Sequence, residues 1–297
     1  MKEEKYKGFI RVKPGENIRL KDCPTGWAQT EALKTVGKVE SKNNACMLLE
    51  HDLTELAQVQ QLLYADDRYS VLIVFQAMDA AGKDGTIKHV MSGINPQGCQ
   101  VFSFKQPSAE ELDHNFLWRY MKSLPERGRI GIFNRSYYED VLVVKIHPEL
   151  LQKLPDGKKD PAFWDARYQD INAFEQHLAR NGTVILKFFL HVSKKVQKER
   201  FIARLDRPEK NWKFSVSDLA ERERWDDYMS AYEQAINSTS TEWAPWHIIP
   251  ADNKWAMRAA VADIITTRLH NLDLNYPLLT GAQMKLLAEA RKQLENE

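Results

Sequence analysis

A lysine and several carboxylates follow an apolar run in segment 71–88, which reads Val-Leu-Ile-Val-Phe-Gln-Ala-Met-Asp-Ala-Ala-Gly-Lys-Asp-Gly-Thr-Ile-Lys. A buried strand, a turn of small residues with a lysine and a following helix form the architecture of a phosphate-binding P-loop. The usual pattern is G-x-x-x-x-G-K-[ST]. Here Ala77 replaces the first glycine and Asp84 replaces the serine or threonine. The alternative is an ordinary strand–turn–helix in which Lys83 is merely exposed.

Asp79 places a carboxylate inside this loop, where most P-loops have none. A carboxylate repels phosphate, so Asp79 is expected either to bind Mg²⁺ or to orient or deprotonate an attacking phosphate oxygen. Lys83 can reach bound phosphates as a point charge. The residues that we predict to contact phosphate in this segment are Ala80, Ala81, Gly82, Lys83, Asp84, Gly85, Thr86 and Lys88.

A second polar segment, residues 129–140, follows the loop by one β–α–β–α interval. In P-loop folds a strand at this distance ends in an aspartate that organises Mg²⁺, and here Asn134 takes that place. Arg135 follows at the same strand end, where open α/β sheets bind ligands. Glu139 and Asp140 can restore the missing negative charge. The structural alternative has Asn134 capping the next helix and Arg135 paired with Glu139.

Basic residues are densest in segment 194–213. Arg200, Arg204 and Arg207 are spaced so that one helix would carry all three on one face. A helix pair with such a stripe is typical of a lid that clamps phosphate, and the alternative is a solvated charged face. The predicted phosphate contacts here are Arg204, Arg207, Lys210 and Lys213. A further basic group, Arg119, Lys122, Arg127 and Arg129, together with Lys105 after the second strand, is expected to hold the second phosphate-bearing substrate.

The elements that must position these residues alternate along the chain. Strands are predicted at 71–76, 99–104, 130–135, 183–190 and 246–250. Helices are predicted at 44–64, 82–93, 109–122, 162–180, 194–205, 216–237 and 254–270. This alternation predicts an α/β fold with a central parallel sheet and helices on both faces. Residues 1–42 are expected to form an N-terminal arm on the body, and 281–297 an amphipathic helix that packs within the chain or on a partner subunit, with intrachain packing as the expected arrangement.

Composition limits the class of protein. The chain has 297 residues and a formal net charge of +1, so an anion site must come from local clustering. Its three cysteines lack metal spacing, which favours reduced thiols in a cytoplasmic protein. No histidine spacing predicts zinc, and no apolar run reaches the roughly 18 residues of a membrane span.

Taken together, these segments resemble the polyphosphate kinase 2 family over about residues 8–270. The motifs that carry the resemblance are residues 77–85, 133–140 and 204–215, followed by 221–228 and 244–246. The resemblance implies one P-loop kinase-like domain over 1–297, a three-layer sandwich similar to thymidylate kinase, with lid helices at 194–237.

The resemblance implies reversible, Mg²⁺-dependent transfer of phosphoryl groups between inorganic polyphosphate and AMP or ADP, with Mn²⁺ as a possible substitute metal. It implies that Asp79, Lys83, Arg135 and Arg204 are catalytic and that Asp79 binds the metal. Asn134, Arg135, Glu139, Lys105, Arg119 and Arg129 are the predicted nucleotide contacts. Asp84, Asn134 and Glu139 resemble the class III branch, which accepts both AMP and ADP. A homodimer or homotetramer is implied, with no nucleic-acid or membrane partner.

Two other functions stay open at this point. One is an ATP-dependent P-loop nucleoside monophosphate kinase, although Asp79 and the displaced acid at Asn134 suit it poorly. The other is a non-catalytic protein that binds polyanions through a kinase fold.

Overall fold

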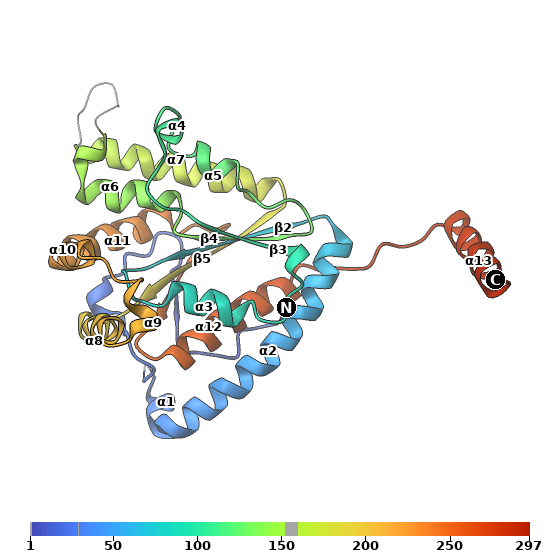
Figure 1. Cartoon of the computed structure of the whole chain (residues 1–297), viewed down its shortest axis with the longest axis horizontal. Helices are drawn as coiled ribbons and strands as arrows, with labels where there is room; N and C mark the ends of the chain where they lie inside the picture. The colour runs from blue at the N-terminus through green and yellow to red at the C-terminus, as the bar shows by residue number, and fades with distance from the viewer. Residues whose placement is uncertain (1, 29, 152–159) are drawn as a thin grey trace.

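A mostly parallel sheet forms the centre of the molecule (Figure 1). The computed structural model describes residues 2–28, 30–151 and 160–297. Within them, six strands lie in the order β1-β6-β5-β2-β4-β3, and β1 alone runs antiparallel to its neighbour. The strands are β1 (Ile10–Arg11), β2 (Ser70–Gln76), β3 (Cys99–Ser103), β4 (Ile130–Asn134), β5 (Thr183–His191) and β6 (Trp246–Pro250). The five strands predicted from apolar runs are confirmed; the two-residue β1 was not foreseen.

Burial of the central strands explains their composition. Every residue of β2 is buried, and β5 is buried after Thr183. Val71 of β2 lies between Ile130 of β4 and Val184 of β5, so branched apolar side chains meet across the sheet. A strand covered on both faces requires such a continuous apolar run.

Helices cover both faces of the sheet, which gives the predicted three-layer sandwich (Figure 1). One layer contains α2 (Lys38–Asp66), α3 (Lys83–Val90) and α12 (Lys254–His270); α12 packs on both others. The opposite layer contains α7 (Pro161–Arg180), which packs on β5 and α11. The remaining helices are α1 (Glu31–Val36), α4 (Ala109–Leu112), α5 (Trp118–Met121), α6 (Val143–Ile146), α8 (Lys194–Leu205), α9 (Pro208–Asn211), α10 (Ser217–Glu223), α11 (Trp225–Thr239) and α13 (Gly281–Glu295).

Two predicted helices are each divided in two. The helix expected at 109–122 is interrupted between α4 and α5, where the Asn115 side chain accepts a hydrogen bond from Leu117 N. Such local side-chain bonding competes with helix continuation. The helix expected at 216–237 breaks at Arg224, between α10 and α11. The break turns α10 toward α8 and α9 at the end of the sheet where β2 and β5 finish (Figure 1).

A buried polar network fixes the turn η3 (Tyr137–Val141) that follows β4. Lys187 of β5 donates to Glu175 at 2.6 Å and to the Tyr138 hydroxyl at 2.8 Å. Tyr137 and Tyr138 both donate to the other oxygen of Glu175, at 2.8 and 2.9 Å. Burial of an ion pair is tolerable only when hydrogen bonds satisfy its remaining atoms, as they do here. The network therefore holds rigidly the turn that carries Glu139.

The two ends of the chain behave differently. Residues 2–28 lie against the body, where Tyr6, Val12 and Leu20 are buried and Tyr6 N donates to the Asp263 carboxylate at 2.7 Å. The C-terminal helix α13 is present as expected, but every residue of it is exposed, and it projects away from the body (Figure 1). The expected intrachain packing of this helix is therefore wrong.

None of the helices formed by the described residues combines the length and the apolar composition that a bilayer span requires.

Candidate active site

The loop after β2 and the start of α3 form the floor of a cavity of about 670 Å³. Ala80 and Gly82 adopt left-handed backbone conformations, with φ of +59° and +113°. A Cβ at Gly82 would also meet the Met257 methyl at 3.2 Å, so only glycine suits this position. The turn leads into the N-terminus of α3, whose first N–H groups and positive dipole end favour an anion.

Lys83 and Asp79 lie in this floor. Lys83 is half-buried, and its ammonium donates to Ala77 O at 2.7 Å, across the loop. Burial lowers the pKa of Lys83, and the nearby carboxylate of Asp79 opposes that shift. Thr86 Oγ1 donates to Gly82 O at 3.0 Å, so Thr86 supports the loop from within α3 rather than lining the cavity.

The end of β4 brings Asn134 and Arg135 to the loop. Arg135 donates to Asp79 at 2.9 Å, and Asn134 Nδ2 donates to Asp84 at 2.8 Å. Arg135 has a φ of +66°, a conformation that costs energy outside glycine and is typical of functional sites. Ser136 rather than Asn134 accepts the capping bond of η3. The alternative reading, in which Asn134 is a helix cap and Arg135 pairs with Glu139, therefore does not describe this geometry.

Glu139 lies behind the cavity floor rather than in it. Its burial raises the pKa of the carboxyl, and the positive charges of Arg135 and Lys83 oppose that shift. Its role in this arrangement is to balance the charge of these two cations from behind. Direct contact with a nucleotide, as predicted from the sequence, would require Glu139 to line the cavity, and it does not.

The predicted arginine stripe divides into three different environments. Arg204 lies in the cavity wall and pairs with Asp218 at 3.5 Å. Arg200 binds backbone carbonyls of the loop. Pro208 ends the helix and leaves Arg207 extended beyond α8 and outside the cavity. The expectation of one helical face with three arginines is therefore wrong for Arg207.

The remaining predicted contacts also separate by position. Lys105, Lys210 and Lys213 line the cavity, whereas Lys88 lies outside it. Arg119 pairs with Glu111 at 3.4 Å and donates to Lys105 O, so it supports the backbone there.

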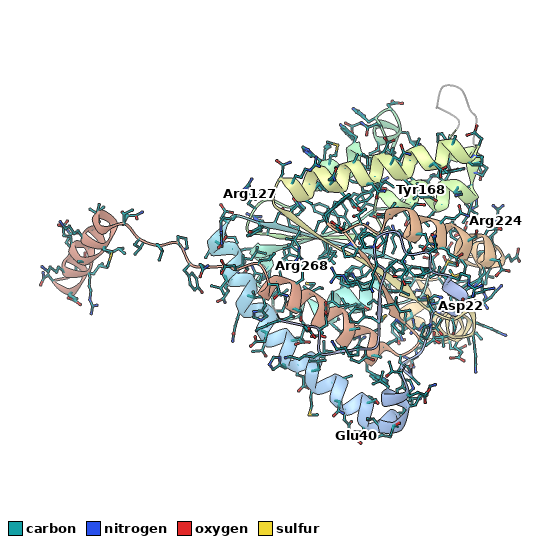
Figure 2. The ribbon with its side chains drawn as sticks, turned by 180° about the vertical axis from the view of Figure 1, so that it is seen from behind. Asp22, Glu40, Arg127, Tyr168, Arg224 and Arg268 are labelled. Carbon is teal, nitrogen blue, oxygen red and sulfur yellow. The ribbon has the colours of Figure 1, made fainter. Side chains whose placement is uncertain are left out.

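Arg129 pairs with Glu126 and precedes β4, at the opposite end of that strand from Asn134. Figure 2 shows Arg127 of the same basic group far from Arg224, which borders α10. Nucleotide contact by Arg129 does not fit this cavity.

The cavity also contains residues that the sequence did not single out. They are Ser103, Phe104, Ala203, Trp212, Lys254, Met257 and Arg258. Lys254 and Arg258 stand one helical turn apart at the start of α12, directly after β6. The rule that ligands bind at the carboxyl ends of parallel strands, applied to β6, was the signal that could have found them.

The charge of the lining is strongly one-sided. Nine cationic side chains, from Lys or Arg, face three aspartates among the residues that line the cavity. Burial lowers the pKa of Lys254, and four neighbouring cations lower it further. These cations are Arg200, Arg258, Lys210 and Arg207. Such repulsion is relieved when an anion with several charges binds between them.

Comparison with known proteins assigns the family. The profile described as "Polyphosphate kinase 2 (PPK2)" matches residues 39–276. The chain belongs to the polyphosphate kinase 2 family. This polyphosphate kinase 2 chain is 53% identical over 288 residues to the ADP-polyphosphate phosphotransferase of Rhodopseudomonas palustris, covering 96% of this chain and 97% of that protein. It is 47% identical over 234 residues to the AMP/ADP-polyphosphate phosphotransferase of Meiothermus ruber, covering 79% and 84%.

A solved structure of the same family shares the fold. The crystal structure of polyphosphate kinase 2 from Arthrobacter aurescens matches with a TM-score of 0.77 and 40% identity, over 94% of this chain and 100% of that one. The predicted family and the predicted P-loop kinase-like fold are confirmed.

Proposed function

We propose that this protein transfers the terminal phosphoryl group of inorganic polyphosphate to AMP and to ADP, in a reversible reaction. The observation that carries the proposal is the cavity itself: a P-loop lysine, the Asp79–Arg135 pair and nine cations against three acids around one opening. A linear polyphosphate offers repeated negative charge and no base to recognise, which such a lining suits. Polyphosphate as sole donor with AMP should give ADP first and then ATP.

The side chains have distinct parts in this reaction. Lys83 and the amides at the start of α3 hold the phosphates beside the bond that breaks. Arg135 and Arg204 approach from β4 and from α8 and neutralise charge on the transferred group. Phosphoryl transfer needs little covalent help from a protein, so positioning two anions in line and screening their repulsion is the main task.

Mg²⁺ is the metal that these residues suit, with Mn²⁺ as a substitute. Among the described residues no cluster of three or more His, Cys, Asp or Glu side chains forms a metal cage. Mg²⁺ is usually bound by one or two carboxylates together with substrate phosphates, and the partly exposed carboxylate of Asp79 in the cavity fits that mode. When bound, the ion would neutralise phosphate charge and polarise the transferred group.

Acceptance of both AMP and ADP is proposed from two sources. The relatives from Rhodopseudomonas palustris and Meiothermus ruber are named for ADP and for AMP/ADP. In this chain two of the residues that set it apart from ordinary P-loop kinases, Asp84 and Asn134, are joined by a hydrogen bond at 2.8 Å. These features support the class III branch. We further propose that the protein is cytoplasmic, with free cysteines at Cys23, Cys46 and Cys99, and that it forms a homo-oligomer.

The α12 cations are proposed to hold the part of the polyphosphate chain beyond the P-loop. Replacing Lys254 and Arg258 together by alanine should raise the KM for long polyphosphate about tenfold and leave kcat within about threefold. The slope of log affinity against log salt should fall by roughly one for each cation removed. Steady-state kinetics over a salt series measures both effects.

The control for this double variant removes one lysine and one arginine elsewhere. Lys285→Ala with Arg291→Ala on the exposed helix α13 makes the same change in net charge. An equal rise of KM in both double variants would show that overall charge, not the α12 site, attracts polyphosphate.

A further inference from the structure

Side chains of α8 hold the backbone of the P-loop by three hydrogen bonds, which together are called the α8 grip. Three consecutive loop carbonyls accept hydrogen bonds from only two residues of that helix. Gln197 Nε2 donates to Asp79 O at 2.9 Å. Arg200 Nη1 donates to Ala80 O at 3.0 Å and to Ala81 O at 2.6 Å. The carbonyl side of the loop is thereby fixed to α8.

This grip determines where the loop amides point. Across a trans peptide the C=O of one residue and the N–H of the next point in opposite directions. With the carbonyls of Asp79, Ala80 and Ala81 turned to α8, the following N–H groups point away from that helix. The Ala81 N–H closes the turn onto Met78 O at 3.2 Å. Ala80 has a φ of +59°, which needs support from its surroundings to persist.

Arg200 differs in this respect from the arginine one turn later. Its second nitrogen, Nη2, donates to Ala251 O at 2.6 Å and to Asp252 O at 3.2 Å, just after β6. The guanidinium therefore links the loop after β2 to the loop after β6, with both terminal nitrogens bound to backbone oxygens. Arg204 instead turns to Asp218 and the cavity. Two arginines at i and i+4 thus have different partners: Arg200 binds the loop backbone, and Arg204 pairs with Asp218.

A third residue connects this grip to α10. Arg222 Nη1 donates to Gln197 Oε1 at 2.6 Å and to Lys194 O at 2.9 Å. Gln197 is 1% exposed, so its amide is held between two partners and cannot exchange them with water. A contact chain runs from α10 through Gln197 to the backbone of Asp79.

We propose that Gln197 and Arg200 are positioning residues that hold the P-loop of Asp79 in its phosphate-binding shape, and that Arg222 couples this shape to the placement of α10. Neither Gln197 nor Arg222 needs to touch a substrate to do this. The inference rests on the proposed reaction. It predicts that damage to the grip lowers kcat, because a displaced catalytic group loses rate more than affinity.

The test uses two substitutions at Gln197 and one at Arg222. Gln197→Glu keeps the size and the bond to Arg222 but has no N–H for Asp79 O. Gln197→Met keeps the length and removes both bonds. Each should lower kcat about 10- to 100-fold, with KM for AMP and for polyphosphate within about threefold of wild type. Arg222 is partly exposed and lies at the α10 end of this series of contacts, so Arg222→Ala should lower kcat less, about 3- to 10-fold.

Gln234→Glu on α11 is the matched control. Gln234 is bonded to Lys145 and Ser230, and this variant should match wild type.

Amide hydrogen exchange of segment 77–85 gives a readout independent of turnover. Exchange there should speed up in Gln197→Met and Arg222→Ala, while the core strands stay protected. Wild-type kcat in Gln197→Met, or losses confined to the KM for polyphosphate, would overturn the proposal. If Gln197→Met fails to fold, Arg222→Ala decides: unchanged kcat and unchanged exchange overturn it. Lack of turnover by wild type in the same assay would contradict the proposed function instead.

Discussion

Asp79→Asn is expected to lower kcat on the order of 10²- to 10³-fold while the loop keeps its shape. The amide oxygen of asparagine can still accept the hydrogen bond that Arg135 now donates to Asp79 at 2.9 Å. The substitution removes one of the three negative charges in a mostly cationic cavity, and with it the proposed Mg²⁺ ligand. Loss of one group that stabilises charge in the transition state commonly costs this much. Initial rates of ADP formation from AMP and polyphosphate measure the effect.

The control for this variant is Asp67→Asn. Asp67 caps α2 in a left-handed conformation that asparagine also adopts readily, and it precedes β2 at the end of the strand away from the cavity. The control should keep full activity. An Asp79→Asn protein with kcat within twofold of wild type would contradict the role assigned to Asp79.

Lys83→Met is expected to lower kcat/KM roughly 10³-fold, chiefly through kcat. Lys83 lies half-buried in the cavity floor and its ammonium donates to Ala77 O, so its charge is held where phosphate is proposed to bind. Methionine preserves the length of the side chain and removes the charge. The affinity for polyphosphate should fall only about 3- to 10-fold, because eight of the nine lining cations remain. Equilibrium binding and steady-state rates separate the two quantities.

Lys42→Met, on the exposed side of α2, supplies the control for loss of one positive charge. Comparison of wild type with Lys83→Met also distinguishes an enzyme from a protein that only binds polyanions. A protein that only binds polyanions shows salt-sensitive binding in wild type and in Lys83→Met, with turnover in neither.

The strands and the loop were predictable because their signals are local. A continuous apolar run gives β2, and small residues around a lysine give the turn that follows it. Parallel strands place their carboxyl ends together, so Asn134 and Arg135 were expected beside the loop, and the structure brings them there. The same rule, applied to Arg129, would have excluded it as a nucleotide contact, because Arg129 precedes β4 and therefore lies at the opposite end of that strand from the cavity.

The parts that escaped prediction depend on tertiary contacts. Helical spacing grouped Arg200, Arg204 and Arg207, but α8 ends at Leu205, so Arg207 lies beyond the helix. Backbone carbonyls of the loop and of the segment after β6 accept hydrogen bonds from Arg200. From the sequence, Lys254 and Arg258 belong to an ordinary buried helix. Only the position of β6 in the sheet shows that they line the cavity. The apolar residues of α13 predicted a packed helix, although nothing local indicated which surface would accept it.

The most direct test of the central claim supplies polyphosphate as the only phosphoryl donor. Purified protein is incubated with Mg²⁺, polyphosphate and AMP, and nucleotides are separated over time, with Asp79→Asn in parallel. The proposed function predicts ADP followed by ATP in wild type and little of either in the variant. Absence of both products from wild type, together with ADP formation when ATP and AMP are supplied, would contradict the account and identify an ATP-dependent nucleoside monophosphate kinase.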